Sequence, residues 1–254
     1  LNLLLLDLPP EMIEGTAQVP RARLAELITR RDLQIGHELA VGVRNGGRGR
    51  GKIVAVDEAS VAIDFRCAER SPNLLPIEVI VAIPRPQILK RLLRDIAMIG
   101  LSKLLLVRSS LTDKNYLKSH ALTESAIFEH LRLGLEQAAI TVAPTVQIFS
   151  SWREFANDWP RAPGSTADLK ILACPSGETS VTEVCRESVW SKAENARAVA
   201  AIGPERGWTD QERGWFVEQG FNVVTFSPRI LRVDVAVNFL AGMLEGMRLD
   251  SRHG

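Results

Sequence analysis

The sequence is poor in residues that cross-link a chain or hold a metal ion. Its 254 residues include three cysteines and four histidines. No cysteine pair has Cys-x-x-Cys spacing and no histidine pair has metal-ligand spacing; these residues are Cys67, Cys174, Cys185, His37, His120, His130 and His253. We therefore expect a reducing, cytoplasmic setting and no structural metal.

A long hydrophobic run is also lacking. The apolar start, residues 1–6, is interrupted by Asn2, ends at Asp7 and has no basic residue before it. No other run approaches the roughly 20 apolar residues of a membrane-spanning helix. We expect a soluble protein that has no membrane partner.

Charge of one sign is not in excess, since 31 basic and 30 acidic side chains give a formal net charge of +1. The distribution is uneven, because residues 81–118 hold eight basic and two acidic side chains. A nucleic-acid partner needs basic residues only where it touches the protein. An apolar fraction of 46% is enough for a sizeable core and excludes global disorder.

The hydrophobic pattern divides the chain near residue 75 and predicts domains at 1–75 and 76–254. Short strands at 37–43, 52–56 and 60–66 are typical of a small all-β unit. Beyond residue 75, short apolar strands alternate with helical patterns, which predicts an α/β architecture with a parallel sheet. The expected strands are 78–83, 103–107, 145–149, 170–173, 199–202 and 222–226, and the expected helices include 122–139, 183–198 and 210–219.

Two helices near the C-terminus carry further signals. Thr209 and Glu212 fit a capping box before the helix at 210–219, and Gly220 fits its C-terminal stop. The last segment carries two neighbouring apolar stripes, Val233, Val237, Leu240 and Leu244 beside Ala236, Phe239, Met243 and Met247. These stripes fit a core-packing helix and a subunit interface equally well.

Four basic residues surround the glycine-rich sequence 45–51, with no acid among them: Arg44, Arg48, Arg50 and Lys52. We expect a turn here whose amides and guanidinium groups lie along phosphates. A hairpin turn made basic for solubility explains the pattern equally well.

Two loops, residues 201–208 and 226–234, follow apolar strands at the ends where open α/β sheets bind ligands. Gly203-Pro204 forces a sharp turn, and Gly207 allows positive φ or close approach of a ligand. Neither loop contains a dinucleotide fingerprint or a P-loop. Without further information, a structural turn is the commoner explanation of each loop.

Taken together, Ile202-Gly203-Pro204-Glu205-x-Gly207-Trp208 and Pro228-Arg229-Ile230-Leu231-Arg232-Val233-Asp234 closely resemble the signature of the bacterial 16S ribosomal RNA uridine N3-methyltransferase family of the SPOUT superfamily. Residues 83–86, 101–107 and 134–137 are similar to further family segments, in order. The resemblance implies a SPOUT-type α/β domain with a C-terminal trefoil knot, preceded by a PUA-like β-barrel that binds RNA. It also implies S-adenosylmethionine as cofactor, 16S rRNA or the small ribosomal subunit as partner, and a homodimer through the knot and last helix.

The resemblance also implies roles for single residues. Arg232 matches the family's active-site arginine, and the candidate RNA contacts are the four basic residues of the turn together with Arg229. The cofactor-binding residues implied by the three knot loops are Ala173, Cys174, Pro175, Gly203, Pro204, Glu205, Gly207, Phe226, Ser227, Ile230 and Leu231.

Methyl transfer from a sulfonium is an in-line displacement, so catalysis depends on positioning and electrostatics. Loss of the uracil N3 proton leaves negative charge on the ring, which the Arg232 guanidinium can stabilise. An ion pair at a subunit interface is the structural alternative for Arg232. Asp234 is a candidate proton acceptor or orienting partner, although the N-terminal cap of the last helix is the favoured interpretation.

The sequence departs from the family pattern at several positions. Arg206 and Ser227 stand where the family has glycine, Asp234-Val235 replaces Glu-Thr, and residues 98–99 and 138–140 differ on the substrate side. Two alternatives therefore stay open: a methyltransferase acting on another RNA site, or an RNA-binding relative that has lost the cofactor.

Overall fold

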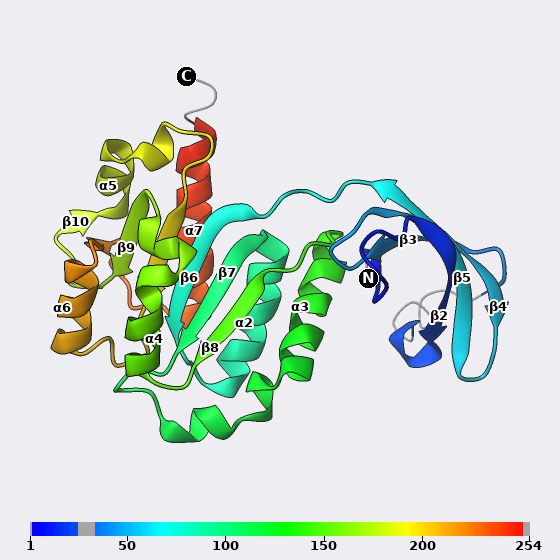
Figure 1. The fold of residues 1–254 in the computed structure, drawn as a ribbon, viewed down its shortest axis with the longest axis horizontal. Coiled ribbons are helices and arrows are strands. Elements are labelled where there is room, and N and C mark those ends of the chain that lie inside the picture. Colours follow the sequence, from blue (N-terminus) through cyan, green and yellow to red (C-terminus); the bar gives the residue numbers. More distant parts are fainter. Residues whose placement is uncertain (1, 25–33, 251–254) are drawn as a thin grey trace. The chain divides into compact units, whose positions relative to one another are not determined.

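The computed structural model describes residues 2–24 and 34–250, which divide into two compact units (Figure 1). The first unit contains Leu1–Asn73 and Glu129–Ala143, and the second contains Leu74–Phe128 and Pro144–Gly254. The domains expected at 1–75 and 76–254 stay a prediction. Leu1 and His253, which entered the sequence interpretation, lie outside the described residues.

The first unit is built on a five-stranded sheet in the order β1-β3-β4-β5-β2. Its neighbouring strands are antiparallel except for β1 and β3. Alternate side chains such as Ile53, Ile63 and Phe65 point inward and are buried. The elements are β1 (Leu4–Leu6), β2 (Glu14–Pro20), the 3-10 helix η1 (Arg21–Leu24), β3 (Glu38–Val43), β4 (Arg48–Val56) and β5 (Ser60–Glu69).

The basic residues are arranged differently from the expected turn. The turn covers only residues 44–47, whereas Arg48, Arg50 and Lys52 belong to β4. The expectation failed because these glycines serve strand packing as well as turning. A Cβ atom at Gly49 would collide with the carbonyl oxygen of Arg66 on β5, so glycine allows the two strands to pair here.

The second half of helix α3 (Glu124–Ala138) belongs to the first unit through a buried carboxylate. The Glu136 side chain is 2% exposed and accepts hydrogen bonds from Arg23 Nη2 at 2.7 Å and Arg132 Nη1 at 2.6 Å. It also accepts the backbone N–H of Leu5 at 3.1 Å. Glu136 therefore joins α3, η1 and β1 of this unit.

The second unit contains a seven-stranded sheet in the order β10-β12-β9-β11-β6-β7-β8, with all strands parallel. This confirms the expected α/β architecture. The strands are β6 (Leu75–Ala82), β7 (Leu101–Val107), β8 (Thr145–Phe149), β9 (Leu169–Ala173), β10 (Thr179–Ser180), β11 (Ala198–Ile202) and β12 (Asn222–Thr225).

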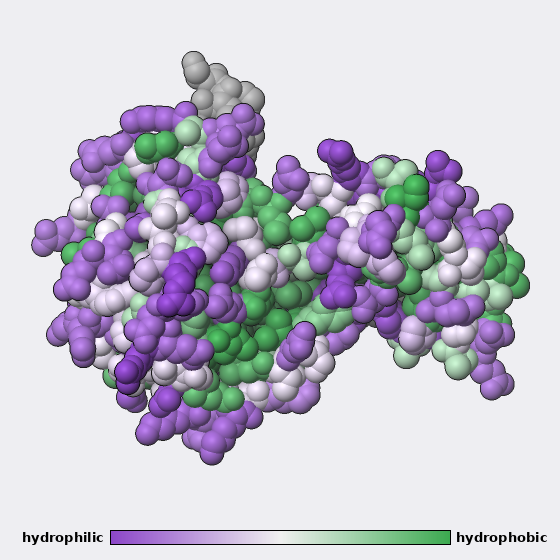
Figure 2. Space-filling model, in the orientation of Figure 1, coloured by the Kyte–Doolittle hydropathy of each residue, from purple (hydrophilic) through white to green (hydrophobic). Residues whose placement is uncertain are grey.

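Helices cover both faces of this sheet, as its continuous apolar strands require (Figure 1). The bounds are α2 (Pro86–Ile99), α4 (Trp152–Asp158), α5 (Val181–Glu187), α6 (Asp210–Glu218) and α7 (Val233–Asp250), with 3-10 helices η2 (Lys114–Lys118), η3 (His120–Leu122), η4 (Trp159–Arg161), η5 (Pro163–Thr166) and η6 (Val189–Ser191). Aromatic side chains from α4, η4 and α6 pack on one face, and α2 packs with α7. On this unit, Figure 2 shows hydrophobic residues gathered over the end of the sheet that contains β7 and β8.

The expected helix at 183–198 was wrong beyond Glu187. Helix α5 ends at Glu187, and the hydroxyls of Ser188 and Ser191 both donate to the Cys185 carbonyl oxygen. Such side-chain bonds offer the backbone an alternative to helical pairing. The capping box of α6 is confirmed, since Thr209 and Glu212 bond reciprocally.

The two apolar stripes of α7 have different environments. Val233, Val237, Leu240 and Leu244 are all buried, so this stripe belongs to the core. In the second stripe, Phe239 is 49% exposed. A subunit interface on this stripe stays a prediction. Within the described residues, no helix is both long and apolar enough to cross a membrane.

We predict that Glu136→Gln lowers the free energy of unfolding of the first unit by about 3 kcal/mol, because two arginines lose their buried counter-charge. Urea denaturation followed by circular dichroism measures the loss. Glu129→Gln is the matched control, since the Glu129 side chain is 55% exposed and pairs with Arg132 on the same helix. Its expected cost is below about 1 kcal/mol. Equal effects of the two substitutions would contradict the anchoring role of Glu136.

Candidate active site

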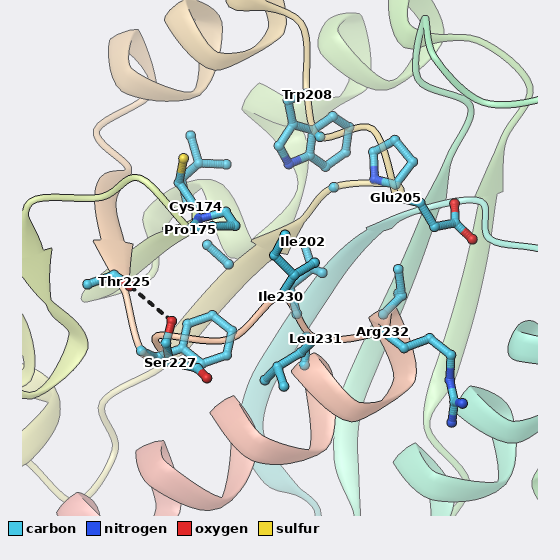
Figure 3. Close-up of a pocket in the computed structure, with 18 of the residues that line it drawn as sticks. Cys174, Pro175, Ile202, Glu205, Trp208, Thr225, Ser227, Ile230, Leu231 and Arg232 are labelled. Atoms are coloured by element: carbon cyan, nitrogen blue, oxygen red, sulfur yellow. Dashed lines mark hydrogen bonds between the residues drawn. The ribbon is translucent and has the colours of Figure 1, made fainter.

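Three loops meet at the carboxyl edge of the parallel sheet and enclose a pocket of about 430 Å³ (Figure 3). Strand β9 lies between β11 and β12, so that Ala173 pairs with Ile202 on one side and Val224 on the other. The loops that follow these strands therefore begin side by side. They contribute residues 173–175, 203–208, 226–227 and 229–232 to the pocket wall.

The pocket brings together all eleven cofactor-binding residues expected from the sequence, and Arg229 and Arg232 line it too. Asp234 does not line the pocket itself but accepts a hydrogen bond from Arg232, which does. Further lining residues were not among the site residues predicted from the sequence: Leu172, Ile202, Arg206, Trp208, Arg213, Thr225, Val233 and Ala236. Ile202, Trp208 and Val233 belong to the signature itself, which could have indicated them.

The loop after β11 is shaped by a tight turn. The Gly207 N–H donates to the Pro204 carbonyl oxygen at 2.8 Å. Gly207 has φ +74°, a left-handed conformation that favours glycine. Beyond it, Trp208 packs against Trp152 and Phe216 with ring centroids 5.7 and 5.1 Å away. The loop is therefore anchored to the aromatic core beneath the pocket.

A buried carboxylate holds the far end of the same loop. Glu212 is 1% exposed, and its Oε2 accepts the Thr209 N–H at 2.9 Å. Its Oε1 accepts the Ser110 N–H at 2.7 Å, from the loop that follows β7. Glu212 thus fixes the start of α6 against a neighbouring loop at this edge of the sheet.

The two residues that replace glycine do not fill the pocket. Arg206 is exposed, and within the described residues it forms no ion pair. The Ser227 hydroxyl accepts the Arg229 N–H at 3.1 Å, so its side chain supports its own loop. The cavity stays open with both substitutions present.

Arg232 and Asp234 form a two-pronged ion pair at the start of α7. Arg232 Nε donates to Asp234 Oδ1 at 2.6 Å, and Nη2 donates to Oδ2 at 2.8 Å. The Asp234 side chain is 3% exposed and the Arg232 side chain 48% exposed. Asp234 lies inside the first turn of α7 and accepts the Val235 N–H as well. The acid therefore orients the half-exposed guanidinium of a residue that lines the pocket, and Figure 3 shows the Arg232 side chain extending away from the cavity.

The electrostatics favour orientation over proton acceptance by Asp234. Burial alone raises the pKa of this carboxyl, but the hydrogen bonds and charge of Arg232 and the Val235 N–H outweigh it, and the pKa is lowered. The hydrogen bond and charge of Asp234 raise the pKa of Arg232. A carboxylate of low pKa that already accepts these bonds is a weak base.

The RNA contacts expected on the first unit differ in availability. Arg44 pairs with Asp7 at 2.7 Å, and Arg48 pairs with Glu69 at 3.7 Å. Arg50 and Lys52 are exposed on β4 and form no ion pair with a described residue. These two side chains are therefore available to contact phosphate groups.

A family model described as the RNA methyltransferase domain matches residues 70–245. The chain belongs to this RNA methyltransferase family. The match covers the sheet, the three loops and most of α7, and it confirms the family resemblance carried by the two C-terminal motifs. No group of three or more metal-ligating side chains occurs in the described part of the chain.

Curated relatives of this methyltransferase include ribosomal RNA small subunit methyltransferase E of Treponema pallidum. It is 29% identical over 205 residues, which cover 80% of this chain and 75% of the relative. Ribosomal RNA small subunit methyltransferase E 1 of Borreliella burgdorferi is 27% identical over 172 residues, covering 68% and 67%.

Solved structures show the same fold. Ribosomal RNA small subunit methyltransferase E of Neisseria gonorrhoeae, bound to S-adenosylmethionine, has a TM-score of 0.74 at 18% identity and covers 97% of each chain. A Legionella pneumophila protein solved with the same cofactor has a TM-score of 0.74 at 16% identity, covering 96% of this chain and 97% of that one.

We predict that Asp234→Asn destabilises the fold at neutral pH and that the effect fades in acid. The folded-state pKa of Asp234 is lowered, so its stabilisation is present above the unfolded-state pKa of about 3.9 and is lost as the pH falls through the folded-state value. Denaturant unfolding across this range measures the difference from wild type. Asp210→Asn removes an exposed carboxylate and is the matched control. A difference for Asp234→Asn that does not change with pH would rule out this coupling.

Proposed function

We propose that this chain transfers a methyl group from S-adenosylmethionine to N3 of a specific uridine in 16S rRNA of the small ribosomal subunit. The observation that carries the proposal is the Arg232 guanidinium, which Asp234 orients beside the pocket of the three loops. The names of the curated relatives support ribosomal RNA of the small subunit as substrate.

The pocket fits S-adenosylmethionine in size and chemistry. Its volume of about 430 Å³ lies in the range of about 300–1,000 Å³ for small-molecule sites. Leu172 and Ile202 supply apolar walls, and three loops supply backbone groups. When bound, the cofactor supplies an electrophilic methyl group. We assign its binding to the eleven loop residues expected from the sequence.

Arg232 acts on the base rather than on the cofactor. Deprotonated uracil N3 carries negative charge that spreads to the ring oxygens, and a preoriented guanidinium stabilises this charge. Asp234 keeps the guanidinium in place. Because Asp234 is a weak base, we propose that the N3 proton leaves to solvent, and methyl transfer then becomes faster as the pH rises above neutrality.

We also propose a homodimer in which a second copy covers the exposed apolar residues beside the site. Ile230 is 89% exposed and Phe239 of α7 is 49% exposed. The Phe239 ring stacks on Phe226 with the two ring centroids 6.1 Å apart. Large apolar side chains gathered at one place commonly mark an interface. The proposal further includes a trefoil knot formed by the three loops, a PUA-like first unit, and a cytoplasmic location with the ribosome.

We expect Arg232→Ala to lower methyl transfer about 100-fold, since it removes one preorganised electrostatic group. The test deletes the gene, restores it as wild type or variant, and measures 3-methyluridine in 16S rRNA by mass spectrometry. Arg153→Ala, which removes an exposed arginine on α4, is the control and should restore methylation fully.

Four results would contradict parts of this proposal. Unchanged 3-methyluridine in the deletion strain would remove the substrate, and methyl incorporation into tRNA instead would indicate another RNA. Full activity of Arg232→Ala would remove its catalytic role. Failure of S-adenosylmethionine to bind in calorimetry would favour an RNA-binding relative without the cofactor.

On the first unit, Arg50→Ala and Lys52→Ala should each weaken RNA binding and reduce the slope of log affinity against log salt by about one, because each removes one phosphate contact. Filter binding to 16S rRNA at several salt concentrations measures the slope. Lys192→Ala, at an exposed lysine of the second unit, is the control. Unchanged slopes for both β4 variants would leave these cations as solvated surface groups.

A further inference from the structure

The pocket wall contains a buried hydrogen-bond donor that has no acceptor. Trp208 is 8% exposed, and its indole Nε1 is buried without a hydrogen-bond partner among the described residues. An unsatisfied buried donor costs about 1–3 kcal/mol of folding stability. Such groups are rare in folded proteins, and a buried donor in a ligand pocket is explained if the ligand supplies the acceptor.

The indole cannot easily turn to find another partner. Its ring packs on Trp152 and Phe216. The ring centroid of Trp152 lies 5.3 Å from that of Trp215. The next residue, Thr209, is fixed by the capping box of α6. Figure 3 shows the nitrogen edge of Trp208 facing the pocket, toward the loop that carries Cys174. The donor is therefore preorganised in position and direction.

The surroundings indicate the kind of acceptor. Leu172 and Ile202, which line the pocket with Trp208, are buried apolar residues, whereas the pocket's Arg206 and Arg229 are exposed. A carboxylate is expensive to bury among apolar groups, so it belongs with the exposed arginines. A neutral ring nitrogen of a purine fits an uncharged donor in an apolar wall.

We infer that Trp208 is a cofactor-contacting residue whose indole N–H donates to a purine ring nitrogen of S-adenosylmethionine. This inference rests on the proposed function and adds a residue to its site. Trp208 then has two roles, since its ring packs in the aromatic core and its indole N–H binds the ligand.

The test uses this 254-residue chain with nitrogen-15 in its tryptophan indoles, observed by NMR. Adding S-adenosylmethionine should move the Trp208 Nε1–H resonance downfield, as expected for a new hydrogen bond. 5′-Methylthioadenosine should produce the same shift, and L-methionine should not. These measurements use wild-type protein, so they hold even if a substitution impairs folding.

Calorimetry supplies a second measurement. Trp208→Phe keeps an aromatic ring but removes the donor, and it should weaken S-adenosylmethionine binding roughly three- to tenfold. Trp215→Phe is the matched control, because Trp215 belongs to the same aromatic cluster and does not line the pocket. It should leave the affinity unchanged.

Each outcome decides the inference. If wild type binds S-adenosylmethionine but the Trp208 resonance stays in place, and Trp208→Phe binds as well as Trp215→Phe, the inference is wrong and the proposed function stands. A shift caused by L-methionine and not by 5′-methylthioadenosine would overturn the purine assignment. If wild type binds no S-adenosylmethionine, both proposals fail.

Discussion

The parallel pairing of β9 with both β11 and β12 is the constraint on which the site depends. Because parallel strands end at the same edge of a sheet, this pairing brings three loops from distant parts of the sequence to one place. Each loop is short and contains a hydrogen bond of its own: Gly177 N–H to the Cys174 carbonyl oxygen, Gly207 N–H to the Pro204 carbonyl oxygen, and Arg229 N–H to the Ser227 hydroxyl. A local sequence motif becomes a pocket only through this pairing, which is why the two C-terminal motifs explain little when each is taken alone.

The apolar and the basic residues of this pocket lie in different environments. Trp208 and Ile202 form part of a buried wall, while the arginines that line the pocket are largely exposed. Asp234 is the exception, a buried acid whose low pKa keeps it ionised and therefore keeps Arg232 oriented. An enzyme that handles a transient negative charge on a base benefits from a cation that needs no reorganisation, and a buried acid supplies that rigidity.

The elements that could be predicted from the sequence are those specified by local pattern. Strand β8 was predicted at its observed bounds, and the capping box of α6 was predicted correctly, because continuous apolar runs and paired caps are local signals. Helix α5 was predicted too long, since serine side chains end it, and the glycines of β4 were interpreted as a turn because their strand partner is far away in sequence. The role of Glu136 had no local signal, because its partner Arg23 lies 113 positions away.

The first unit is formed by two separate segments of the sequence, and this affects how such a protein can evolve. The five strands of its sheet come from the start of the chain, but residues 129–143, with Glu136, come from within the sequence of the second unit. A terminal fusion would therefore transfer the strands without the carboxylate that neutralises Arg23. Exchange of this module between genes requires two coordinated changes, so the two units are expected to be inherited as a pair.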